Sequence, residues 1–196
     1  VATVGIDKLK DAAQAVWDIG ASFDEAYDTI RIGTGATGDA FESLKQSTKS
    51  IASAIPADME TVGTTVADIN TRLGLTGDTL ETVASQYLQA GNILGEEVDI
   101  AATTAAFSAF KLEGDAVAGG MDTLFQVSQA TGVGFNELAD SVQKNAPALQ
   151  NLGFSFEDTA AMVGLLDKSG LNADQVMGSL SKSLVTLSKD GERPAD

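Results

Sequence analysis

Cysteine and histidine are both absent from this chain of 196 residues. Without cysteine, the segment can form neither a disulfide nor a thiolate metal site. Without histidine, it lacks the side chain that most often serves as a general base or a metal ligand. Within this segment, the two absences exclude zinc hydrolases and enzymes built on a Ser-His-Asp or Cys-His arrangement.

Proline and long apolar runs are scarce as well. The three prolines stand at Pro56, Pro147 and Pro194, so long stretches of the chain are free to be helical. The longest runs without a charged residue are residues 82–95 and 123–136. Both are shorter than the roughly 20 apolar residues that span a bilayer, and polar residues and glycine interrupt them. We therefore expect no membrane span in this segment.

Positive charge is scarce relative to negative charge. Lysine and arginine number 12 against 28 aspartates and glutamates, which gives a net charge of −16. The acids are spread along the chain, as is typical of solvated helix faces and helix N-termini. Because an acidic surface repels phosphate groups, we expect no direct binding of nucleic acid. Apolar residues make up 43% of the chain, which is enough for a hydrophobic core.

A succession of amphipathic helical patterns is what the sequence does contain. In several segments, apolar residues recur at intervals of three and four, and no useful length alternates like a strand. The stripes are Ile6, Leu9, Ala13, Val16 and Trp17; Leu80, Val83, Ala84, Tyr87 and Leu88; Val117, Met121, Leu124 and Val127; Phe135, Leu138, Ala139 and Val142; and Val176, Leu180, Leu184 and Leu187. The pattern predicts an all-α fold of about ten short amphipathic helices in helical hairpins that form a compact bundle.

Short turns with glycine separate the predicted helices. In each turn, a glycine ends one helix and a polar cap begins the next helix two residues later. The clearest pairs of glycine and cap are Gly20 with Ser22, Gly153 with Ser155, and Gly170 with Asn172, and a looser copy begins at Gly74. Ser22 and Glu25 have the spacing of a capping box. Helix breaks are predicted near residues 20, 35, 56, 75, 94, 113, 132, 153 and 170.

Three patterns suggest chemistry, but each also has a structural explanation. Residues 167–174 offer oxygen ligands, but the positions of glycine and glutamate do not fit an EF-hand, and Asn172 fits a helix N-cap. Glu96, Glu97 and Asp99 could pair for acid–base catalysis, but acids after a glycine are simply favoured in a first helical turn. Residues 33–38 have G-x-G-x-x-G spacing without a preceding strand, which indicates a turn between helices.

The aromatic residues are predicted to belong to the core. Six phenylalanines stand among alanines and leucines without interleaved lysine or arginine, so they do not resemble a platform for stacking bases. They are Phe107, Phe110, Phe125, Phe135, Phe154 and Phe156. Phe154 precedes the expected cap Ser155, where it could form a hydrophobic staple with Thr159 or Ala160. We assign no catalytic, cofactor-binding or metal-binding residue in this chain, and no cofactor.

An ordered set of motifs in the second half resembles the core domain of phage tail tape-measure proteins. The motifs are residues 107–114, 121–124, 131–138, 152–160, 164–170 and 180–187. Their order across residues 70–190 resembles the family best, whereas residues 1–15 hardly resemble it. Residues 175–178 depart from the glycine-rich element that the family has at this place. We expect a helical domain over residues 1–190, with residues 191–196 as a linker or boundary of the segment.

The resemblance implies a structural, non-enzymatic role in the virion of a phage or prophage. A tape measure is a long helical chain, in part coiled coil, that templates assembly of the tail tube, sets the tail length and leaves during genome ejection. The implied partners are the tail tube protein, tail assembly chaperones, baseplate or tail-tip proteins and other copies of the chain. The implied location is inside the tail tube, and in the host cytoplasm during assembly.

Two other functions fit the composition. A bacterial helical adaptor that binds a partner protein would show the same composition and the same hairpins. The length of the parent chain distinguishes the two functions, because a tape measure should have many hundreds of residues. A peptidoglycan hydrolase that uses only carboxylates would need a desolvated glutamate in a cleft, and activity in a peptidoglycan zymogram would reveal it.

Overall fold

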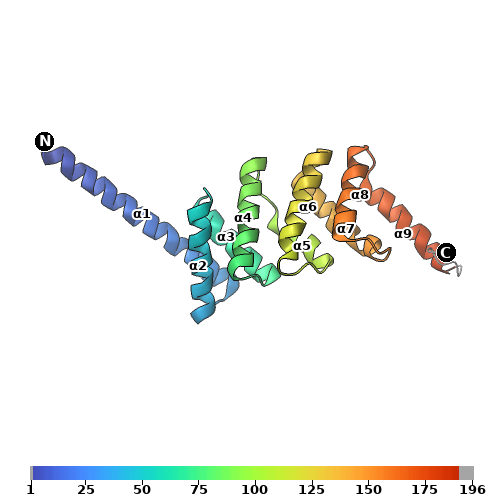
Figure 1. Ribbon diagram of the computed structural model, residues 1–196, viewed down its shortest axis with the longest axis horizontal. Helices are drawn as coiled ribbons and strands as arrows, with labels where there is room; N and C mark the ends of the chain where they lie inside the picture. The colour runs from blue at the N-terminus through green and yellow to red at the C-terminus, as the bar shows by residue number, and fades with distance from the viewer. Residues whose placement is uncertain (1, 190–196) are drawn as a thin grey trace. The chain divides into compact units, whose positions relative to one another are not determined.

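The computed structural model describes residues 2–189, in which the chain forms nine α-helices and no strand (Figure 1). The side chains of residues 2–13, 15–17, 19, 181, 184, 185 and 187–189 lie outside the description. The expected apolar stripe from Ile6 to Trp17 and the expected core positions Leu184 and Leu187 therefore fall outside it too. Over the described residues, the all-α prediction is confirmed, with nine helices where about ten were expected.

Backbone contacts divide the chain into an N-terminal unit, Val1–Gln89, and a C-terminal unit, Ala90–Asp196. The N-terminal unit contains α1 (Ala2–Thr34), α2 (Gly38–Ala54), α3 (Met59–Leu73) and most of α4 (Gly77–Leu94). Helix α3 packs along α1, and α2 packs against α3. The expectation of one domain over residues 1–190 stays a prediction.

Helix α1 runs straight through Gly20, so the predicted helix break near residue 20 is wrong. Gly20 is not among the glycines with positive φ. The Ser22 hydroxyl donates to the carbonyl of Asp18, 2.9 Å away and one turn earlier, as a serine within a helix does. The predicted capping box with Glu25 is therefore absent. A glycine inside a helix costs only about 1 kcal/mol, which the burial of Ala26 and Ile30 further along the same helix readily offsets.

The other eight predicted breaks are confirmed, and the caps explain them. Gly74 ends α3 in the left-handed conformation with a φ of +67°. At the other end of α3, the Asp58 carboxylate accepts a hydrogen bond from the Thr61 backbone N–H at 2.8 Å. That N–H and the Thr61 hydroxyl hold the pKa of Asp58 below its ordinary value, because both stabilise the charged form. The expected cap Ser155 begins α8 and forms a capping box with Asp158.

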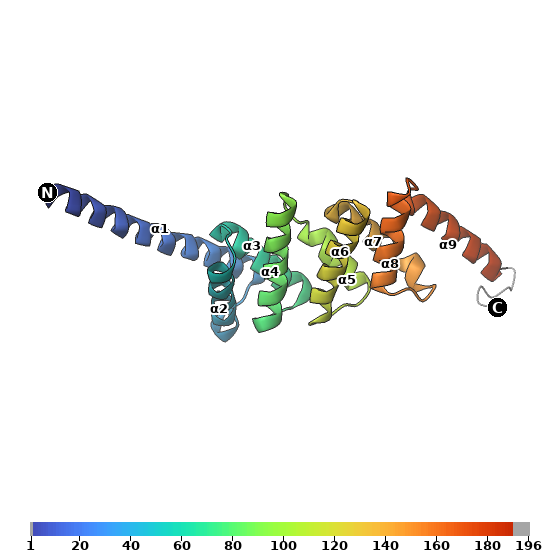
Figure 2. The same ribbon diagram turned by 45° about the horizontal axis from the view of Figure 1, so that its top comes forward.

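The C-terminal unit is built around α7. Its helices are α5 (Ile100–Ala109), α6 (Ala116–Thr131), α7 (Phe135–Gln150), α8 (Phe156–Lys168) and α9 (Ala173–Lys189). Helix α7 packs against all four of the others, and α6 also packs against α8 (Figure 2). The largest fully buried side chains of this unit are Phe107, Leu124, Phe135, Leu138, Leu149 and Phe156. Helix α8 thus buries one face against α6 and α7.

Helix α5 ends in a Schellman turn that carries lysine where glycine is usual. The Leu112 N–H donates to the carbonyl of Phe107, and the Lys111 N–H donates to the carbonyl of Ser108, both at 3.0 Å. This pair of bonds places Lys111 at a φ of +57°, and no other residue except glycine has a positive φ among the described residues. A side chain in this left-handed region is strained by the proximity of its Cβ to the backbone.

Replacing Lys111 with glycine is expected to stabilise the protein. Removal of the Cβ relieves the strain, and we expect the free energy of unfolding to rise by about 1 kcal/mol. Urea denaturation followed by circular dichroism measures the change. Lys111→Ala serves as the matched control, because it removes the charge but keeps the Cβ, and we expect a change of less than about 0.5 kcal/mol. An equal gain in both variants would show that the charge, and not the backbone, is responsible.

Candidate functional site

The acidic cluster at residues 96–99 lies in the connection between α4 and α5. Asp99 is the N-cap of α5, and its carboxylate accepts a hydrogen bond from the Ala102 N–H at 2.9 Å. Glu96 and Glu97 precede the cap, so the prediction that they belong to a first helical turn is wrong. Asn136 of α7 fixes the loop instead, because its side chain accepts from the Asp99 N–H and donates to the Glu97 carbonyl. This bridge was not predicted from the sequence.

The oxygen-rich stretch at residues 167–174 consists of helix caps, as the N-cap interpretation predicted. The Asn172 side chain accepts a hydrogen bond from the Gln175 N–H at 2.8 Å, and that of Asp167 accepts from the Ala173 N–H at 3.1 Å. Asp174 points elsewhere and accepts from the side chains of Ser141 and Asn145 on α7. These carboxylates therefore hold α9 against the bundle. Within the described part of the chain, no group of three potential metal ligands comes together.

The glycine motif at residues 33–38 is the turn between α1 and α2. Helix α1 ends at Thr34, Gly35 has a φ of +66°, and α2 begins at Gly38. The Thr34 hydroxyl accepts a hydrogen bond from the Ala36 N–H at 3.1 Å. A side chain of the turn itself therefore satisfies this backbone N–H. The interpretation of this motif as a turn between helices is confirmed.

The six phenylalanines divide into two groups of three. Phe107, Phe135 and Phe156 are fully buried, which confirms their assignment to the core. Phe110, Phe125 and Phe154 are only half-buried. Phe110 still belongs to the aromatic cluster, since its ring meets that of Phe156 edge-on at 5.6 Å between centroids. The core prediction therefore holds fully for three of the six residues.

Tyr27 of α1 is a titratable group with a shifted pKa. Burial raises the pKa of its hydroxyl, and the carboxylates of Asp24 and Glu42 raise it further. Lys45 of α2 lies with its amine 5.3 Å from the centroid of the Tyr27 ring and 5.6 Å from that of Phe41. A phenol with a raised pKa stays protonated near neutral pH, so this group cannot act as a base or nucleophile there. The cluster joins α1 to α2.

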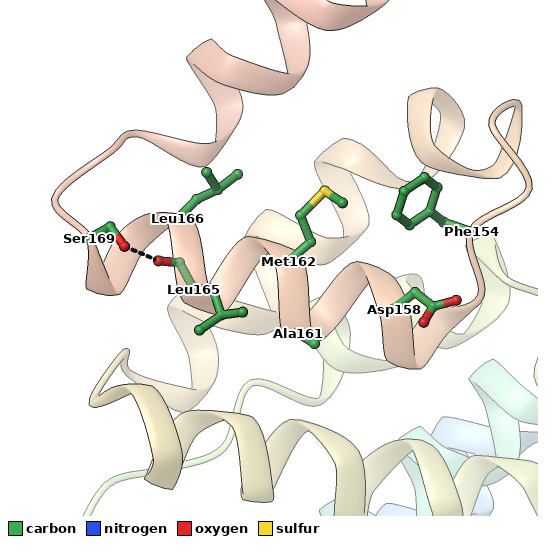
Figure 3. Close-up of a pocket in the computed structure, with 7 residues that line it drawn as sticks. All are labelled: Phe154, Asp158, Ala161, Met162, Leu165, Leu166 and Ser169. Carbon is green, nitrogen blue, oxygen red and sulfur yellow. Dashed lines mark hydrogen bonds between the residues drawn. The ribbon is translucent and has the colours of Figure 1, made fainter. Parts of the chain in front are cut away.

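An open groove runs along the outward face of α8. Its volume is about 450 Å³, and it is lined by Phe154, Asp158, Ala161, Met162, Leu165, Leu166 and Ser169 (Figure 3). We call this surface the α8 groove. Five of its seven lining residues are apolar, and the Leu165 side chain is 58% exposed. The groove suits an apolar partner surface, because its lining is mostly apolar and contains few polar groups that could bind a polar ligand or catalyse a reaction.

Phe154 lies at the mouth of this groove, before the N-cap Ser155. Its ring stands on the same side as Met162 and Leu166 in Figure 3. The expected staple of Phe154 with Thr159 or Ala160 stays a prediction. The sequence did contain a signal for the groove, since Ala161, Met162, Leu165 and Leu166 form a second apolar stripe on α8 beside the buried one.

Comparison with known proteins relates the C-terminal unit to phage tails. A family model described as phage-related minor tail protein matches residues 95–195, just over half of the chain and nearly the whole C-terminal unit. A probable tape measure protein of Escherichia phage P2 is 42% identical to this chain over 59 residues. That stretch makes up 30% of this chain and 7% of the phage P2 protein, so the chain spans only a small part of that relative. No solved structure matches the chain.

Among the described residues, no helix combines the length and the apolar character needed to cross a bilayer.

Proposed function

The chain belongs to the family of phage-related minor tail proteins, and from this premise we propose that it is one segment of a tail tape measure. In this role, the segment forms part of the helical chain that templates the tail tube, contributes to tail length and leaves the tube when the genome is ejected. The observation that carries the proposal is the family match over residues 95–195, with the identity to the phage P2 tape measure as support.

Two features of the chain support a structural role without catalysis. The acidic clusters at residues 96–99 and 167–174 serve as caps and connections, with carboxylates bonded to backbone N–H groups. The surface charge is strongly negative, at −16 for the chain, which suits a protein that shares a narrow tube with a path for DNA and must not adhere to it.

The partners that go with this role are proteins of the tail. The tail tube protein, the tail assembly chaperones, the baseplate or tail-tip proteins and other copies of the chain are the proposed contacts. The proposed location is the interior of the tail tube in the virion, and the host cytoplasm before assembly. Residues 1–190 are proposed as the helical domain of the tape measure, with residues 191–196 as a linker or boundary of the segment.

Deletion of residues 1–190 from a phage that carries this segment is expected to shorten the tail. If the segment is stretched as helix along the tube, 190 residues at about 1.5 Å each correspond to roughly 285 Å. Electron microscopy of negatively stained tails measures the difference directly.

A variant with the segment replaced by a helical linker of 190 residues is the matched control. It is expected to restore the tail length, because a ruler depends on length and not on side chains. Tails of unchanged length after the deletion would contradict the ruler role. Failure of both variants to form tails would contradict it as well, because the segment would then be required for something other than its length.

A further inference from the structure

Helix α9 is attached to the C-terminal unit by its N-terminal half. It packs against α7 and α8. Among its described side chains, Ala173 and Met177 are buried, at 2% and 3% exposed. Over residues 178–186, every described side chain is exposed. Helix α7, in contrast, buries eight residues between Phe135 and Leu149, along its whole length. The attachment of α9 is therefore short, and little apolar area secures it.

A polar cluster between α9 and α7 completes the attachment. The Asp174 carboxylate accepts a hydrogen bond from the Asn145 amide at 2.8 Å and another from the Ser141 hydroxyl at 3.2 Å. Asn145 and Ser141 are only 5% and 8% exposed, so Asp174 takes the place of water as their partner while α9 is docked. When α9 leaves, water can bond to both donors again. Separation of such a polar contact costs less than separation of an apolar contact of the same area.

Helix α8 ends in a turn that does not depend on α9. The Gly170 N–H donates to the carbonyl of Asp167 at 2.9 Å. The Leu171 N–H donates to the carbonyl of Leu166 at 3.0 Å. These two bonds satisfy the last carbonyls of α8 within the turn itself. Across the turn, the Asp167 carboxylate accepts from the Ala173 N–H at 3.1 Å. Helix α9 can therefore separate after this turn while α8 keeps its cap.

We propose that α9 is a detachable strap. It leaves α7 and α8 as one unit while α5 to α8 stay folded, and the bonds of Asp174 to Asn145 and Ser141 hold it closed. Segments that move in proteins are those with the least buried contact, and α9 is such a segment. The inference goes beyond the role of the chain in tail length, since it concerns a change of conformation within the C-terminal unit.

Hydrogen exchange of the whole chain, followed by mass spectrometry of proteolytic peptides, tests the proposal. A helix of 17 residues is marginal in water on its own, so the amides of α9 exchange each time the strap opens. We expect them to exchange at least about tenfold faster than the buried amides of α7.

Replacing Asp174 with alanine is expected to speed the exchange of α9 by about tenfold, because a hydrogen-bonded charge is lost from the closed state. The factor is expected to be the same throughout α9, since the whole helix opens in one step. Exchange in α5 to α8 is expected to stay unchanged.

A second variant separates the bonds of Asp174 from its effect on the helix dipole. An acidic residue in a first turn stabilises a helix with or without a partner. Asn145→Ala removes the main partner on α7 and leaves the first turn of α9 intact, and we expect it to speed the exchange of α9 by about fivefold. When Asn145 is already alanine, Asp174→Ala is expected to add a factor of less than about three, because the two residues act through one contact.

Gln175→Ala is the matched control. Gln175 is the exposed neighbour of Asp174 in the same turn of α9, and its replacement keeps the carboxylate in place. We expect the exchange of α9 to change by less than about twofold. Circular dichroism of each variant checks that it is folded, and we expect native spectra, because alanine favours a helix at all three positions.

Three outcomes would overturn the proposal. The first is faster exchange of α7 and α9 by one common factor in Asp174→Ala, which would show that α9 opens only when the bundle unfolds. The second is an effect of Asp174→Ala confined to residues 173–177, which would show that the rest of α9 frays independently. The third is an equal effect of Asp174→Ala with and without Asn145→Ala, which would leave only the helix dipole. None of these depends on tail length, so the proposed function is tested separately.

Discussion

Replacing Phe107 with alanine is expected to lower the free energy of unfolding of the C-terminal unit by about 3–5 kcal/mol. The Phe107 side chain is 0% exposed, and its ring lies 5.4 Å from that of Phe156 between centroids. It also faces Gly120 of α6 so closely that a Cβ there would come within 2.8 Å of the ring. Truncation leaves a cavity bounded by helices that are held by other contacts, so the cavity cannot close fully.

Urea denaturation followed by circular dichroism at 222 nm measures this loss. Phe125→Ala is the matched control, because it removes the same side chain from a half-buried position on α6 of the same unit. We expect a smaller loss, of about 1–2 kcal/mol, since less apolar area leaves the core. Equal losses in the two variants would contradict the central place of Phe107 in the core.

The same experiment tests whether residues 1–190 behave as one domain. If the N-terminal and C-terminal units unfold independently, Phe107→Ala moves only the transition of the C-terminal unit. If the chain unfolds as a single cooperative domain, the whole transition moves together. A total stability of 5–15 kcal/mol is usual for a domain, so a loss of this size is large enough to separate the two cases.

Most helix boundaries of this protein could be predicted from the sequence because the signals are local. Gly74 and Gly132 end α3 and α6 in left-handed conformations, and a cap such as Asp58 is visible in the residue type and its position. Gly20 and Ser22 have the same residue types and spacing as the turns that end helices, but here the helix continues through them. A glycine permits a helix to end but does not require it, and the choice depends on packing further along the helix.

The sequence contains the apolar stripe of the α8 groove, but it does not show that this stripe is the one that stays exposed. Helix α8 has apolar residues at Ala160 and Val163 and equally at Met162 and Leu165, so its periodicity alone does not identify the buried face. That choice is made by α6, where Val127 and Thr131 meet α8 at Gly164 and admit no side chain there. The groove is the face that remains after this close contact has formed.

The bridge made by Asn136 shows a second limit of the same kind. Asn136 stands 37 residues from Asp99 in the chain, and its amide reaches the backbone of the connection between α4 and α5. From the sequence alone, an asparagine in a first helical turn cannot be distinguished from one whose side chain is simply exposed to solvent. Its role follows from the packing of α7 beside α5, which only the tertiary structure provides.

Replacing Gly63 with leucine is expected to destabilise the N-terminal unit by about 3 kcal/mol. Gly63 is buried where α3 crosses α1, and a Cβ added there would lie 3.0 Å from both the Cα and the Cβ of Ala26 and 3.1 Å from its carbonyl oxygen. These are mostly backbone atoms, which cannot move aside as the end of a side chain can. The two helices must therefore separate, although leucine favours a helix more than glycine does.

Gly20→Leu is the matched control, since Gly20 lies within α1 and a Cβ there would meet no atom within 4 Å. We expect this variant to gain up to about 0.8 kcal/mol in the free energy of unfolding, measured by the same urea titration, because leucine stabilises a helix interior. If α1 instead broke at Gly20 in a left-handed turn, the variant would lose about 1–2 kcal/mol. A loss at Gly20 would thus contradict the continuous helix, and stability unchanged by Gly63→Leu would contradict the close crossing of α1 and α3.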